Sequence, residues 1–378
     1  MNASPQTAAP AIRFPIIRSA IPRPDAWLEF IDVAYRSGRF SNFGLLCRQL
    51  EDELVARWGT QGETCVLASS GTAAITAALI ATGVEGNVLV PAFTFPASLA
   101  AIRMAHARPL VIDVDQHDWR VSPTALDVAF ARTSARAAVV VNPFGSMHDF
   151  SAHARVASRH NAILVIDNAA GLGVKRTAYT RDAVTFEAYS LHATKPFGIG
   201  EGGAIFAPRE FDERLRKALN FGLPDPDTKP NWGINGKLSE LHAAVGLAVA
   251  RGFTDALRTR QQLAARYIDV ASRFPALSFC RQPSSSSWQL FPMLFPCPET
   301  TNCFAQACAT LGMETRRYYA PSLSVIPECE VLEPCPVSES LSQRMCCAPV
   351  YSHVDQMESV ELPRILESAL HQALGTNM

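Results

Sequence analysis

The sequence predicts an α/β fold, with a mostly parallel sheet flanked by helices in a large domain and a smaller C-terminal α+β domain. Three observations support this fold. First, the chain has 378 residues, of which 48% are hydrophobic, so it can bury two substantial cores. Second, short apolar runs alternate with alanine-rich segments between about residues 51 and 250. Third, a long helical pattern separates this region from a differently patterned C-terminal part.

These patterns divide the chain into three regions. Residues 1–45 are expected to form an N-terminal segment with a disordered start, residues 46–250 the large domain, and residues 251–378 the small domain. The large domain carries the sheet, so we expect the ligand site there.

Four apolar runs predict the strands of the large domain. Each is short and shows little polar alternation, which is typical of strands buried on both faces. Alanine-rich stretches at residues 72–82 and 96–106 indicate helices between strands. Because right-handed crossovers bring the carboxyl ends of parallel strands to one sheet edge, a ligand site is expected at that edge. The predicted strands cover residues 87–91, 109–113, 137–142 and 162–167.

The C-terminal third has its own sequence of elements. Residues 238–273 are rich in alanine, leucine and arginine and predict a long helix or a helix pair that links the two domains. A strand is expected within residues 288–296, and helices within 302–312 and 359–374.

Composition excludes several classes of function. A net charge of −1 with 18% charged residues argues against nucleic-acid binding and against a basic membrane patch. No apolar run is long enough to span a bilayer, and residues 1–10 lack the order of a signal peptide. The ten cysteines show no C-x-x-C spacing, so we expect free thiols, no metal site and a cytoplasmic location.

The most informative stretch surrounds Lys195. This lysine follows an apolar run and precedes a turn with four glycines, at positions 198, 200, 202 and 203. Asp167 ends another apolar run upstream. A lysine amine can bond to the aldehyde of pyridoxal phosphate, and a carboxylate can keep the cofactor's ring nitrogen protonated. Lys195 and Asp167 are therefore the candidate catalytic pair.

A turn of small residues, Ser69 to Thr72, lies between an apolar run and an alanine-rich helix. Backbone N–H groups at a helix start, with the helix dipole, can bind a phosphate. A serine or threonine at this position is also commonly a plain helix cap. The residues alone leave both interpretations open.

The order and spacing of these motifs resemble the DegT/DnrJ/EryC1/StrS family of sugar aminotransferases over roughly residues 40–360. The resemblance implies a fold-type-I enzyme that depends on pyridoxal phosphate. It also implies that Gly71, Thr72 and Ser190 bind the cofactor phosphate, and that Phe95 stacks on the cofactor ring.

Two further expectations come from the same resemblance. In the family, an asparagine in a Gly-x-Asn motif reaches the cofactor phosphate of the neighbouring subunit, and Asn235 matches it. This implies a homodimer with shared active sites. His192, Arg316 and Tyr318 are candidate substrate contacts, although His192 could equally be a packed histidine and the other two a solvated rim.

The chain departs from the family pattern at three positions. Ala170 stands where many members have Gln or His against the cofactor's ring oxygen. Lys237 replaces the usual arginine, and the two cations differ in bidentate contacts. Ser322 stands close to the place where members often have histidine. The change at Ala170 concerns the ring-oxygen contact and the substrate pocket, the change at Ser322 concerns the substrate pocket, and the role of Lys237 is left open.

The predicted function is transfer of an amino group from an amino acid, in this family usually glutamate, to a keto sugar that is nucleotide-linked. Related dehydratases replace the lysine by histidine, so Lys195 argues against that branch. The alternatives are a pyridoxal phosphate enzyme acting on a non-sugar ketone or an amino acid, and a non-catalytic sensor that binds the cofactor.

Overall fold

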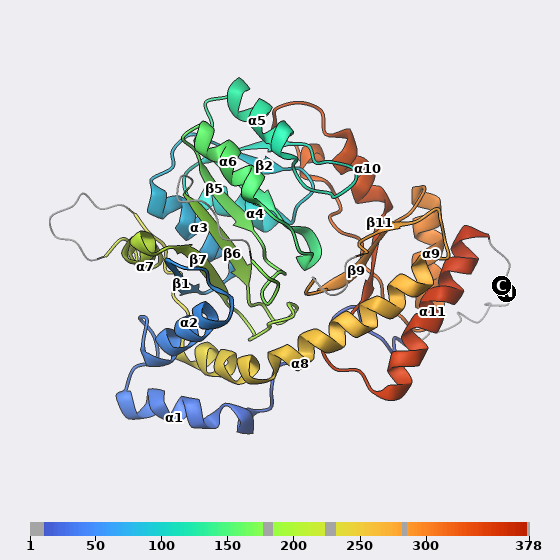
Figure 1. Ribbon diagram of the computed structural model, residues 1–378, viewed down its shortest axis with the longest axis horizontal. Coiled ribbons are helices and arrows are strands. Elements are labelled where there is room, and N and C mark those ends of the chain that lie inside the picture. The colour runs from blue at the N-terminus through green and yellow to red at the C-terminus, as the bar shows by residue number, and fades with distance from the viewer. Residues whose placement is uncertain (1–10, 177–183, 224–231, 282–285, 376–378) are drawn as a thin grey trace, which may run out of the picture.

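The structure, a computed structural model, describes residues 11–176, 184–223, 232–281 and 286–375. The expected disordered start, residues 1–10, lies outside the described residues. Two sheets organise the fold, one of eight strands and one of three (Figure 1). Helix α8 (Glu240–Ala271) runs along the lower side of the view and joins them, so the predicted long helix is a single helix.

The larger sheet has the strand order β1-β7-β6-β5-β4-β2-β3-β10. Neighbouring strands are parallel except where β7 pairs with β1 and β6, which confirms the mostly parallel sheet. The four predicted strands correspond to β2, β3, β4 and β5. The strands are β1 (Glu63–Ala68), β2 (Asn87–Pro91), β3 (Arg108–Ile112), β4 (Ala137–Val141), β5 (Ile163–Asp167), β6 (Thr185–Ser190), β7 (Gly203–Pro208) and β10 (Glu330–Val331).

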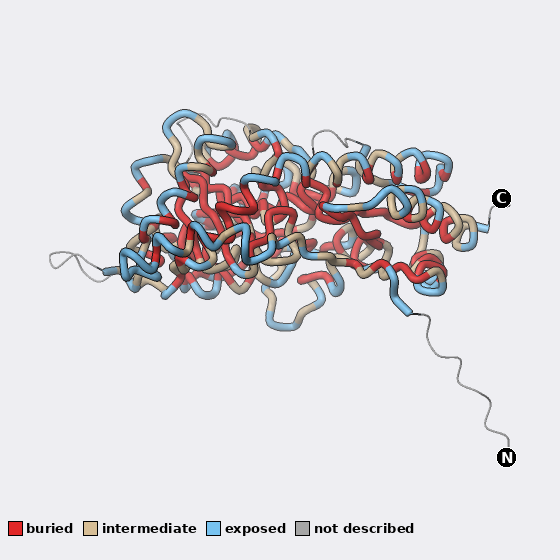
Figure 2. The backbone as a smooth tube through the Cα atoms, turned by 90° about the horizontal axis from the view of Figure 1, so that it is seen from below, coloured by how far each residue is buried: buried red, intermediate tan, exposed pale blue. Residues whose placement is uncertain are grey.

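Helices cover both faces of this sheet, because successive strand residues point to opposite sides. In β4, Val139 packs on one core and Val140 on the other. Figure 2 shows the buried backbone running through the middle of the molecule. One face carries α3 (Gly71–Thr82), α4 (Pro96–Met104) and α7 (Asp212–Leu219); the other carries α5 (Pro123–Arg132), α6 (Ser151–Arg159), α2 (Leu45–Trp58), α1 (Leu28–Ser37) and the first half of α8.

The smaller sheet is antiparallel, in the order β11-β9-β8. It packs against the second half of α8 and two further helices. The predicted boundary between residues 250 and 251 falls inside α8 and stays a prediction. The elements are β8 (Ser278–Phe279), β9 (Leu290–Leu294), β11 (Met345–Pro349), α9 (Pro298–Thr310), α10 (Pro336–Arg344) and α11 (Gln356–Leu374), with short 3-10 helices at Pro24–Ala26, Pro143–Gly145, Arg209–Phe211 and Leu323–Val325.

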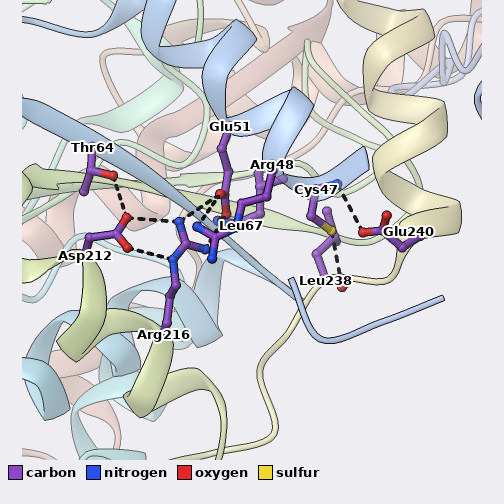
Figure 3. A network of polar contacts seen from close by, with 9 residues as sticks. All are labelled: Cys47, Arg48, Glu51, Thr64, Leu67, Asp212, Arg216, Leu238 and Glu240. Carbon is purple, nitrogen blue, oxygen red and sulfur yellow. Dashed lines mark hydrogen bonds and ion pairs between the residues drawn. The ribbon is translucent and has the colours of Figure 1, made fainter. Parts of the chain in front are cut away.

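A buried ionic network fixes α2 against the sheet and α7 (Figure 3). Arg216 donates to both carboxylate oxygens of Glu51, at 2.9 and 3.0 Å, and also to Asp212. The backbone N–H of Leu67, in β1, donates to Glu51 at 3.0 Å. The Glu51 carboxylate is therefore satisfied from two elements, as a buried charge requires.

The same figure shows how the start of α8 holds the start of α2. The buried Glu240 carboxylate accepts N–H groups from Leu46 at 2.7 Å and Cys47 at 3.1 Å. Because Gly44, the N-cap of α2, has no capping side chain, Glu240 serves as the cap. A Cβ on Gly44 would lie 2.7 Å from Glu240 Cδ, so this contact requires glycine.

The described part of the chain has neither a candidate membrane span nor a candidate metal site. None of its helices has the length and apolar character needed to cross a bilayer. None of its His, Cys, Asp and Glu side chains form a group of three that could hold a metal ion.

Candidate active site

A cavity of about 360 Å³ lies at the carboxyl ends of β4, β5 and β6. It is lined by the last residue of each of these strands: Val141, Asp167 and Ser190. This is the sheet edge that the parallel topology predicts. Its volume is in the range of small-molecule sites.

The cavity brings together nearly all the site residues that the sequence predicts. Asn235 lies outside it. The predicted residues that line the cavity are Gly71, Thr72, Phe95, Asp167, Ser190, His192, Lys195, Arg316 and Tyr318.

Lys195 lies in the tight loop between β6 and β7. Its backbone N–H donates to the His192 carbonyl at 2.8 Å, and Gly200 takes a φ of +105°, which favours glycine. The Lys195 Nζ donates to Gln289 Oε1 at 3.2 Å. Burial lowers the pKa of Lys195 to about 8, although the nearby Asp167 carboxylate acts in the opposite direction. The amine therefore loses its proton more readily than an exposed lysine.

Asp167 is buried at the end of β5. Its Oδ2 accepts the Ser98 hydroxyl at 2.6 Å, and its Oδ1 accepts the Ala169 N–H at 3.2 Å. Burial raises the pKa of Asp167, while both hydrogen bonds and the charge of Lys195 lower it. Ser98 is a site residue that sequence reasoning missed, although it lies one helical turn after Phe95.

The start of α3 serves as a cap and also faces the cavity. Ser70 is the N-cap, and its Oγ accepts the Ala73 N–H at 3.0 Å. Gly71 and Thr72 follow at positions where helix N–H groups have no intrahelical partner. A Cβ on Gly71 would lie 2.9 Å from the Ser190 Cβ, so glycine allows the helix to approach β6. This helix start is suited to a phosphate.

Phe95 and His192 form other parts of the wall. Phe95 precedes α4 and is 57% exposed, so one face of its ring is available to a flat ligand. His192 Nδ1 lies 2.9 Å from the Thr194 hydroxyl and accepts the Thr194 N–H at 3.2 Å, and its Nε2 lies 3.5 Å from Glu201 Oε1. His192 is hydrogen-bonded locally and also accessible from the cavity.

The substrate candidates Arg316 and Tyr318 lie on the strand-like segment that meets β11. Arg316 pairs with the Cys347 backbone and is exposed, and Glu314 lies 3.7 Å from its guanidinium. A hydrogen bond with Tyr318 raises the pKa of Arg316. These two side chains provide a cation and a phenol at the cavity wall.

The three departures from the family pattern lie in different places. Ala170 lines the cavity, and its carbonyl accepts the Ser287 hydroxyl. Lys237 donates to Asn235 at 2.8 Å and to Asn220 at 2.7 Å, away from the cavity. Ser322 is buried outside the cavity and caps the turn that follows it. Only Ala170 therefore changes the cavity wall directly.

The donor set of the cavity suits pyridoxal phosphate. It offers an amine of lowered pKa, a buried carboxylate, an open aromatic ring and a helix start for a phosphate. When bound, this cofactor supplies a conjugated ring that accepts an electron pair from the substrate carbon. The fold and the site thus define a class, the pyridoxal phosphate-dependent enzymes of the α/β type.

Comparison with known proteins assigns the chain to one family within this class. The model of the DegT/DnrJ/EryC1/StrS aminotransferase family matches residues 26–366. The chain belongs to this family, whose members are aminotransferases dependent on pyridoxal phosphate.

Individual relatives and structures agree with this assignment. The chain is 30% identical to Protein Rv3402c of Mycobacterium tuberculosis, with 90% of this chain and 86% of that protein covered. It is 26% identical to the dTDP-4-amino-4,6-dideoxy-D-glucose transaminase of Shigella dysenteriae, with 88% and 93% covered. A crystal structure of DesI with its TDP-sugar product matches with a TM-score of 0.83 and 25% identity, covering 97% and 95% of the two chains.

Proposed function

We propose that this aminotransferase moves an amino group from glutamate to a keto sugar carried on a nucleotide. The observation that carries the proposal is the pairing of Lys195 and Asp167 in one cavity. The substrate class is supported by the similarity to a dTDP-sugar transaminase and to DesI. A cytoplasmic location stays a prediction.

Each of the predicted residues that line the cavity has a part in this proposal. With the cofactor bound, the Lys195 amine would take the proton from the amino-acid carbon that bears the nitrogen and, as the ammonium, would return it to the carbon on the other side of that nitrogen, because its lowered pKa suits both steps. Asp167 would hold the ring nitrogen through its charge. Gly71, Thr72 and Ser190 would hold the phosphate, and Phe95 would cover the ring. His192, Arg316 and Tyr318 face the substrates.

The proposal includes a homodimer in which Asn235 contributes to the partner's site. Asn235 is exposed and lies outside its own cavity, which supports a role elsewhere. Three apolar side chains in the segments that meet at Glu240 are also partly exposed: Phe40, Leu45 and Leu241 are 39%, 57% and 44% exposed. Glu240 brings them together, since its N–H binds the Phe40 carbonyl and its carboxylate caps Leu46. Contiguous exposed apolar surface is typical of protein interfaces, and in the proposed dimer these side chains would contribute to it.

The substrate class can be tested with a panel of acceptors. The holoprotein is mixed with glutamate and, in separate reactions, with keto sugars linked to dTDP or UDP, a free keto sugar and a non-sugar cyclic ketone. Formation of 2-oxoglutarate and of the amino product is followed by mass spectrometry. Turnover with a nucleotide-linked keto sugar supports the proposal, and turnover with the non-sugar ketone alone would reject it.

A further inference from the structure

A glutamine from the small-sheet region reaches the amine of Lys195. Gln289 immediately precedes β9, lines the cavity and is 8% exposed. Its Oε1 accepts a hydrogen bond from Lys195 Nζ at 3.2 Å, across 94 residues of sequence. Within the described ranges, Gln289 is the only side chain that accepts a hydrogen bond from this amine.

A buried arginine fixes the backbone that carries Gln289. Arg260 of α8 is 4% exposed and donates to the carbonyl oxygens of Ser287 at 3.3 Å, Trp288 at 3.0 Å and Gln289 at 2.8 Å. No carboxylate of the described chain pairs with Arg260, and burial lowers its pKa to about 9. Burying a cation against neutral groups costs free energy. We attribute the burial of Arg260 to these three hydrogen bonds, which hold the backbone of residues 287–289 in place.

The backbone conformation at Trp288 is also costly. Trp288 is buried and has a φ of +52°, a left-handed conformation that a bulky residue seldom adopts. Such a conformation costs free energy and persists only where its surroundings enforce it. Ser287, on its other side, donates its N–H to the Gly145 carbonyl at 2.9 Å. The hydrogen bonds of Arg260 and Ser287 therefore hold this turn in the conformation that places Gln289 at the cavity wall.

The chemistry of a side-chain amide suits contact with a lysine that changes its protonation state. An amide oxygen accepts a hydrogen bond from the ammonium and from the neutral amine alike. A neutral amine that donates one N–H to Gln289 keeps its lone pair free to take a proton. The amide Nε2 has no partner among the described residues, so it can also donate to a bound substrate.

We propose that Gln289 is a positioning residue for Lys195, holding its amine in place whenever the amine is not bonded to the cofactor. The inference rests on the proposed function, because only a turnover that frees this amine needs it held. Gln289 does not itself take the proton. It limits the orientations of Lys195 so that the amine nitrogen faces the substrate carbon.

Two variants with opposite expected effects test the proposal. Gln289→Glu places a carboxylate beside the amine and stabilises its charged form, whereas Gln289→Leu removes the acceptor and destabilises that form. The protein is loaded with pyridoxamine phosphate, which leaves the lysine free. Acylation of Lys195 is then measured by peptide mass spectrometry across a range of pH. We expect the labelling midpoint to rise by about one pH unit in Gln289→Glu and to fall in Gln289→Leu.

A kinetic measurement complements the labelling. Single-turnover reaction of the holoprotein with glutamate at pH 7 should slow about tenfold or more in both variants. Raising the pH should restore part of the rate in Gln289→Glu but none in Gln289→Leu. Gln306→Leu is the control, since this amide is exposed on α9, does not line the cavity and makes no contact with Lys195 or with the backbone of residues 287–289. Its labelling midpoint and its rate should equal those of the unchanged protein.

The results separate the two proposals. Midpoints that stay at the wild-type value in both variants, or that move in the same direction, would overturn the role of Gln289. Labelling requires no amino donor and no sugar. Opposite shifts in a protein that transaminates no keto sugar would therefore support the Gln289 contact while rejecting the proposed substrates.

Discussion

Two opposing influences act on the pKa of the Lys195 amine. Burial lowers its pKa from 10.5 to about 8, and the Asp167 carboxylate holds it from falling further. A lysine in this state keeps a usable fraction of neutral amine near physiological pH while remaining able to carry a proton. The same pair thus provides both the nucleophile and the carrier that transamination needs.

This balance predicts a pH dependence for cofactor uptake. Only the neutral amine bonds to the cofactor, and the neutral fraction rises as the pH passes upward through the pKa. The rate at which cofactor-free protein captures pyridoxal phosphate should therefore rise with a midpoint near pH 8 and then level off. Asp167→Asn removes the charge that raises this pKa, so its midpoint should lie lower. Stopped-flow absorbance measures both, and a midpoint near 10 in the unchanged protein would contradict the burial argument.

Ser98 is predicted to support Asp167. Its hydroxyl donates to the carboxylate at 2.6 Å and lowers the pKa of Asp167. Ser98→Ala removes this bond, so less of the carboxylate remains ionised to hold the ring nitrogen. We expect the affinity for pyridoxal phosphate to fall about tenfold, in line with a hydrogen bond to a charged group.

A fluorescence titration with pyridoxal phosphate measures this effect of Ser98. The matched control is Ser342→Ala, a buried serine of α10 that donates to the Glu339 carbonyl away from the cavity. Equal affinities in the two variants would show that Ser98 does not act on the cofactor through Asp167.

Much of the site could be predicted residue by residue because its motifs are local. Lys195 with its glycines, and Gly71 with Thr72, each lie in one short turn whose spacing carries the information. Gln289 could not be predicted in this way, because its contact with Lys195 joins segments 94 residues apart. Only the packing of the small sheet against the larger one creates that contact.

At the scale of elements, the cap that Glu240 provides to α2 joins the start of one helix to the start of another. Glu240→Ala leaves the N–H groups of Leu46 and Cys47 without their acceptors in a buried place. We expect the free energy of unfolding to fall by about 2 kcal/mol. Urea denaturation measures the change, with the exposed Glu85→Ala as control. A loss as small as that of the control would mean that α2 is not capped in this way.

Whether a helix or strand could be predicted from the sequence depends on whether local or long-range contacts stabilise it. The strands β2 to β5 lie inside the sheet, so their sequences are continuous apolar runs that indicate strands by themselves. The two-residue strand β10 exists only because Glu330 and Val331 pair with β3, and no local pattern marks it. The antiparallel direction of β7 depends on the return of the Lys195 loop, which apolar patterning does not encode.

At the scale of the whole molecule, the proposed dimer makes each active site depend on two chains. Lys195→Ala removes the amine from a chain's own cavity, whereas Asn235→Ala would remove a group from the partner's cavity. Each variant alone should be inactive or strongly impaired. In a mixed dimer of the two, one site carries both defects and the other carries none.

Mixing the two inactive variants therefore tests the shared site. After unfolding and refolding together, about a quarter of the wild-type activity should return, because half of the dimers are mixed and each has one intact site. Refolding each variant separately is the control. No regained activity, in a sample that light scattering shows to be dimeric, would mean that Asn235 does not serve the partner.

The central claim is that Lys195 bonds to the cofactor in this cavity and releases it when an amino donor arrives. The most direct measurement is the absorption spectrum of the purified holoprotein before and after glutamate is added, with Lys195→Ala beside it. We expect the unchanged protein to show a band of the lysine-bound cofactor that glutamate converts to the band of pyridoxamine phosphate. We expect neither the band nor its conversion in Lys195→Ala. The same conversion in Lys195→Ala would contradict this claim.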